Sequence, residues 1–152
     1  MSKIRDEINA LLNKPPAIVV HITRRDSWSD DTDAGAISLV EWIEYVNWDF
    51  QMELRNEYRL PLKKFGLAKE DTVYQKPGLS VWKAHQIKIL YEPPSFEYER
   101  GNINVTEPDN ETIKKMIVIA ERMNAKVQGN DGKIYEYSEY FKESKNPWWK
   151  FW

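Results

Sequence analysis

The chain has 152 residues, no cysteine and a formal net charge of −2. This length is typical of one domain, and the charge shows none of the basic excess usual in nucleic-acid-binding proteins. The lack of cysteine excludes disulfides, thiolate metal sites and cysteine nucleophiles. No segment has the roughly 20 consecutive apolar residues of a membrane-spanning helix, and the N-terminus lacks the apolar stretch of a signal peptide. We therefore expect a cytoplasmic protein with no transmembrane segment and no nucleic-acid partner.

The first elements in chain order are a helix and a strand. Apolar residues recur at helical spacing after Ser2, a good capping residue, until Pro15 and Pro16 end the pattern. They are Ile4, Ile8, Leu11 and Leu12. Residues 17–23, AIVVHIT, are rich in β-branched side chains, which predicts a strand inside a sheet.

A polar stretch, DSWSDDTDAG, follows this strand and predicts an exposed, flexible loop. Its spacing does not match a calcium-binding EF-hand, because Gly35 stands where the third oxygen ligand belongs. An acidic loop with an exposed tryptophan can instead face a basic partner protein. The candidate partner-binding residues of this loop are Asp26, Trp28, Asp30, Asp31 and Asp33.

The middle of the chain predicts one clear helix and several strands. Ser38 and Glu41 form a capping box before an apolar face that continues to about Trp48. Residues 49–76 show no clear period, so we expect an irregular segment with a helical turn near residues 50–58. Residues 79–91 predict a strand with a bulge near 84–86, and two short strands should meet at Arg100 and Gly101.

The clearest signal lies in residues 106–137. Apolar residues at helical spacing predict a helix that ends near Asn124, and GNDG between AKVQ and KIYEY then predicts a hairpin. Strands joined by short turns pair antiparallel, and the helices should pack on one face of the sheet. We therefore predict a single two-layer α+β domain over residues 1–152, with an aromatic tail at 146–152.

Few residues offer catalytic chemistry. His21 and His85 both fall in predicted strands, where two imidazoles with a carboxylate could form an acid/base pair or bind a metal. A strand histidine bonded within the core is the simpler interpretation. The glycines match no phosphate-binding motif, and the glutamates that alternate with Phe96 and Tyr98 are typical of a solvated strand face. We predict no catalytic residue, no metal site and no cofactor.

The C-terminal sequence NPWWKFW combines large aromatic rings with lysines. Three interpretations stay open: rings buried in the core, a partner or self-association site, or a peripheral membrane contact. Its candidate partner-binding residues are Trp148, Trp149 and Trp152.

The segments SLVEWIEYV, GNINV and PDNETIKKMIVIAERMNAKVQGNDGKIYEY resemble a set of small, uncharacterised bacterial cytoplasmic proteins of toxin-immunity type. The resemblance covers mainly residues 38–46 and 101–137, and residues 49–78 have no counterpart in it. It implies a protein that blocks a secreted toxin by binding it.

The sequence therefore favours a non-enzymatic binding module, an immunity protein whose partner is a basic toxin domain. Two alternatives stay open. One is a small enzyme that uses His21 and His85. The other is a structural or membrane-peripheral protein that acts through its C-terminal tryptophans.

Overall fold

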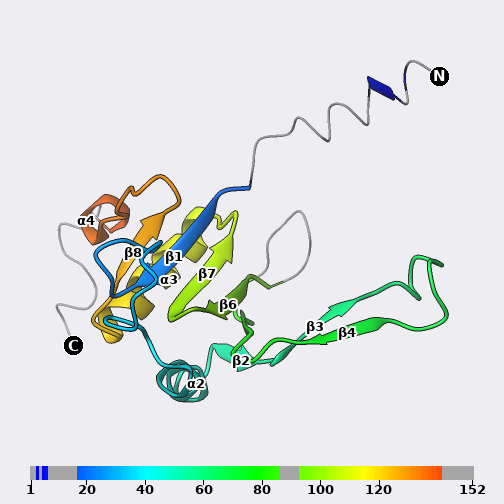
Figure 1. Cartoon of the computed structure of the whole chain (residues 1–152), viewed down its shortest axis with the longest axis horizontal. Helices are drawn as coiled ribbons and strands as arrows, with labels where there is room; N and C mark the ends of the chain where they lie inside the picture. The colour runs from blue at the N-terminus through cyan, green and yellow to red at the C-terminus, as the bar shows by residue number, and fades with distance from the viewer. Residues whose placement is uncertain (1–2, 4, 7–16, 86–92, 142–152) are drawn as a thin grey trace.

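A computed structural model describes residues 3, 5–6, 17–85 and 93–141 (Figure 1). Its main feature is a six-stranded sheet in the order β2-β5-β6-β7-β1-β8, in which every neighbouring pair is antiparallel. These strands are β1 (Val19–Thr23), β2 (Met52–Leu54), β5 (Ser80–Trp82), β6 (Ser95–Glu99), β7 (Asn102–Thr106) and β8 (Lys126–Gly129). A second sheet pairs β3 (Glu57–Leu60) with β4 (Thr72–Gln75). The α+β fold predicted from the sequence is confirmed.

Two helices provide the second layer of the core. They are α2 (Leu39–Trp48) and α3 (Asn110–Arg122), and a short helix, α4 (Tyr137–Tyr140), contacts α3. Alternate residues of β1, Val20 and Ile22, are fully buried and join one apolar cluster with Trp42 of α2 and Met116 of α3. Burial of these apolar side chains is the main stabilising contribution to the fold.

The helices begin where capping chemistry allows it. The Ser38 hydroxyl accepts a hydrogen bond from the Glu41 N–H, and the Glu41 carboxylate accepts one from the Ser38 N–H, which completes the predicted capping box of α2. Asp109 caps α3 by accepting a hydrogen bond from the Thr112 N–H at 2.8 Å. Both helix starts therefore follow from local sequence.

The turn between β6 and β7 matches the prediction from Arg100 and Gly101. Both residues have positive φ, 51° and 83°, as a tight turn between twisted strands requires. A Cβ on Gly101 would lie 2.7 Å from the Cβ of Ala36. Glycine is therefore needed here both for the turn and for the close approach of the loop before α2.

Residues 49–76 differ from the sequence prediction. We expected an irregular segment with a helical turn near 50–58, and the structure instead has β2, β3 and β4 there. Met52 pairs with Trp82 of β5, so partners distant in sequence stabilise a strand of only three residues. The local pattern was too short to reveal this pairing.

The other predicted strands are shorter than expected. The strand predicted at 79–91 ends at Trp82, and residues 86–92 lie outside the described residues. In the final hairpin, β8 is present but its partner is reduced to one bridge between Gln128 and Ile134 before α4 begins. The first predicted helix lies mostly outside the described residues, which contain no helix long and apolar enough to cross a membrane.

Candidate functional site

The sheet face opposite the helices carries polar side chains. In β1, His21 alternates with the buried Val20 and Ile22 and therefore points to the other face. It lies opposite Asn104 of β7, which in turn lies opposite Glu97 of β6. The alternation that builds the core on one side thus lines up polar groups on the other.

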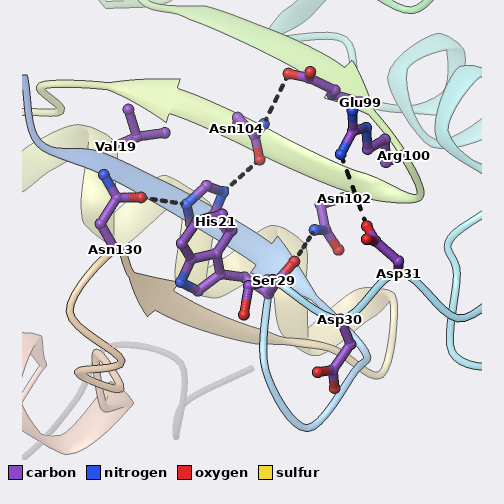
Figure 2. A pocket seen from close by; sticks show the side chains of 11 residues that line it. Val19, His21, Ser29, Asp30, Asp31, Glu99, Arg100, Asn102, Asn104 and Asn130 are labelled. Carbon is purple, nitrogen blue, oxygen red and sulfur yellow. Dashed lines mark hydrogen bonds and ion pairs between the residues drawn. The ribbon is translucent and has the colours of Figure 1, made fainter.

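The acidic loop before α2 lies over this polar face (Figure 2). Two residues, Trp28 and Arg25, hold it there. The Trp28 ring stacks on the His21 ring with a centroid distance of 4.2 Å and an angle of 4° between the planes. The Trp28 N–H donates to the Gln128 side chain at 2.8 Å, and Asn102 donates to the Trp28 carbonyl at 2.8 Å. The prediction of an exposed Trp28 is therefore wrong, because its ring is half-buried.

Arg25 is the second anchor of the loop. Its side chain is buried and donates to the carbonyls of Thr32 and Arg100, which joins the loop to the turn between β6 and β7. It also donates to the Asn102 side chain at 3.3 Å. A buried guanidinium with several acceptors fixes the backbone of the loop, so the aspartates that follow it start from a defined position.

His21 belongs to a chain of polar contacts. The Glu99 carboxylate accepts from the Asn104 amide nitrogen at 3.5 Å, and the Asn104 oxygen lies 2.6 Å from Nδ1 of His21. Because the Glu99 carboxylate can only accept, the amide nitrogen of Asn104 faces Glu99 and its oxygen faces the imidazole. Nε2 lies 2.8 Å from the Asn130 oxygen (Figure 2).

Loop and sheet together enclose a cleft of about 390 Å³. Its lining residues are Val19, His21, Trp28, Ser29, Asp30, Asp31, Glu99, Arg100, Asn102, Asn104 and Asn130. The lining contains three carboxylates and one guanidinium, and Arg100 lies 3.7 Å from Asp31. Within the described part of the chain, neither Asp30 nor Glu99 pairs with a cation. The cleft therefore presents an excess of negative charge beside an aromatic ring.

The two histidines lie in separate networks. His85 was predicted to lie in a strand, but it lies in the turn that follows β5. There its Nε2 contacts the Asp109 carboxylate at 2.7 Å. In the sheet, β6 and β7 separate β5 from β1, which carries His21. The structure does not bring the two imidazoles together. Among the described residues, no group of three or more His, Cys, Asp or Glu side chains could hold a metal ion.

The predicted partner-binding residues divide into three groups. Trp28, Asp30 and Asp31 line the cleft. Asp26 and Asp33 are exposed on the same loop but do not line it. The tail residues Trp148, Trp149 and Trp152 lie outside the described residues.

No protein-family model, curated protein or solved structure matches this chain. The asparagines of the cleft were not predicted from the sequence, although Asn102 and Asn104 stand at alternate positions of NINVT, on the face that β1 uses for His21. Asn130 could not be assigned to the cleft, because its position depends on how the turn after β8 meets β1.

Proposed function

We propose that this protein is a non-enzymatic binding module that takes a cationic side chain of a partner protein into its acidic cleft. In its most concrete form the partner is a basic toxin domain, and the protein is an immunity protein that blocks it. The observation that carries the proposal is the anchoring of Asp30 and Asp31 beside Glu99 by the half-buried Trp28. Binding costs less ordering entropy when the charged loop is already held in place.

A lysine or arginine side chain fits the chemistry of this cleft. Its charge meets the unpaired carboxylates of Asp30 and Glu99, and its methylenes can lie along the Trp28 ring. Asn102 and Asn104 add polar groups at the floor. Charge complementarity of this kind favours rapid association and excludes acidic partners.

The test is isothermal titration calorimetry, which measures the affinity of this protein for the basic protein encoded by the neighbouring gene. We expect Asp30→Asn/Glu99→Gln to weaken binding about tenfold, which corresponds to about 1.4 kcal/mol for two partly exposed charges. Both changes preserve side-chain shape, so the fold should be unaffected.

The matched control is Glu44→Gln/Glu121→Gln, which removes the same charge from exposed positions on α2 and α3. It should bind like the unmodified chain. Equal weakening by both double variants would mean that only net charge matters. A neighbouring product that does not bind at all would overturn the toxin-immunity assignment.

A further inference from the structure

The second sheet forms an arm that extends away from the rest of the molecule. Figure 1 shows β3 and β4 running outward from the edge of the main sheet that carries β2, whereas β1 and β8 lie at the other edge. We call residues 57–75 the arm and residues 61–70 its tip. The tip therefore lies beyond the β2 edge of the main sheet, whereas the cleft lies on a face of this sheet near β1.

The tip exposes apolar side chains that nothing in the described chain covers. Phe65 and Leu67 are 65% and 74% exposed. The turn itself is formed: the Leu67 N–H donates to the Leu62 carbonyl at 2.9 Å, and Gly66 adopts a φ of 69°. Phe65 and Leu67 are thus held outward by a defined backbone.

The tip carries three lysines and one carboxylate, that of the exposed Glu70, so its charge is positive. Lys63, Lys64 and Lys69 are exposed, and none of them pairs with a carboxylate within the described residues. The neighbouring Asp71 is engaged by Arg59 at 3.5 Å and by the Lys63 N–H at 3.1 Å. The tip therefore combines unpaired ammonium groups with apolar side chains.

Farther back on the arm, Tyr58 and Tyr74 lie opposite each other on one face, and both are exposed. Tyrosine is enriched at the boundary between lipid and water, where its ring is partly apolar and its hydroxyl stays hydrated. From the tip backward, the arm therefore presents apolar side chains, then lysines, then tyrosines. This order is expected for a segment that enters the surface of a bilayer.

We propose that the tip of the arm docks on an anionic lipid bilayer. Phe65 and Leu67 enter the boundary between headgroups and acyl chains, while Lys63, Lys64 and Lys69 meet anionic headgroups. A convex tip can enter a deformable surface without a preformed pocket. Because the tip lies beyond the β2 edge and the cleft lies near β1, docking through the tip keeps the cleft away from the negative surface. The contact is independent of the proposed partner binding.

The test is co-sedimentation of the full chain with vesicles of phosphatidylcholine alone or of phosphatidylcholine with phosphatidylglycerol. We expect binding to the anionic vesicles to be at least tenfold tighter and to fall with added salt. Phe65→Ser/Leu67→Ser and Lys63→Glu/Lys64→Glu should each reduce it at least tenfold. All four positions are exposed, so thermal unfolding should not change.

Two single-residue variants outside the arm serve as controls for the type of side chain that is changed. Phe50→Ser removes a phenylalanine that is 82% exposed on the main body, and Lys83→Glu reverses an exposed lysine outside the arm. Both should bind vesicles like the unmodified chain. The proposal is overturned if the unmodified chain does not bind anionic vesicles, or if the tip variants bind as tightly as the controls. A third measurement is binding to soluble polyglutamate. If the chain binds polyglutamate as tightly as vesicles, and Phe65→Ser/Leu67→Ser does not weaken this binding, the membrane proposal is overturned, because the tip would then bind an acidic protein.

Discussion

Asp49 and Lys115 form a buried ion pair between the end of α2 and the middle of α3. Their side chains are 8% and 9% exposed, and the ammonium lies 2.7 Å from the carboxylate. Burial alone would raise the pKa of Asp49, but hydrogen bonds from Lys115, Tyr45 and the Gln51 N–H lower it below the usual value. The pair fixes the relative position of two helices that cover the core.

Lys115→Met should destabilise the protein by about 3–5 kcal/mol, because it leaves the Asp49 carboxylate buried without its cation. Urea unfolding followed by circular dichroism measures this loss. As a control, Glu57→Gln removes an exposed partner of Arg59 and should cost less than about 1 kcal/mol. Similar losses for both variants would contradict a structural role for the buried pair.

At the scale of elements, the start of α3 is tied to the turn after β5. Asp109 accepts hydrogen bonds from the Thr112 N–H and hydroxyl and contacts His85 at 2.7 Å. Burial works to raise the pKa of Asp109, but these hydrogen bonds outweigh it and hold the pKa below the usual value. The ionised carboxylate is thus favoured in the folded state.

A carboxyl whose pKa is lowered by folding stabilises the protein above its unfolded pKa, and this contribution is lost as the pH falls through the folded pKa. Asp109→Asn should therefore reduce the loss of stability on acidification below about pH 4, while asparagine still caps the helix. The melting temperatures of both proteins, measured at a series of acidic pH values, test this expectation. Asp26→Asn, on the exposed part of the loop, should leave the pH profile unchanged. A profile unaltered by Asp109→Asn would contradict this role.

Elements that depend on capping residues, turn residues or helical spacing could be predicted from the sequence. The capping box at Ser38, the apolar face of α3 and the turn at Arg100 and Gly101 are all present in the structure. The strand β2 could not be placed in the same way, since it has three residues and depends on a distant partner, and the strand predicted at 79–91 is only as long as β5. The residues of the cleft were also only partly predictable, because some of them come together only through strand pairing. His21 and the aspartates were found, but Glu99 and the asparagines reach them only through the register of β6, β7 and β8.

At the scale of the whole molecule, the charges are arranged asymmetrically although the net charge is only −2. Unpaired carboxylates gather at the cleft beside β1, and unpaired lysines gather at the tip of the arm beyond β2. Net charge alone therefore hides two surfaces that favour partners of opposite sign.

The central claim is that the cleft binds a cationic side chain. It is tested most directly by an NMR titration with N-acetyl-arginine amide, compared with the N-acetyl-citrulline amide of the same shape and no charge. The arginine probe should shift the Trp28 indole and the side-chain amides of Asn102 and Asn104, and Asp30→Asn/Glu99→Gln should abolish these shifts. Equal shifts with both probes, or shifts confined to residues outside the cleft, would contradict the account.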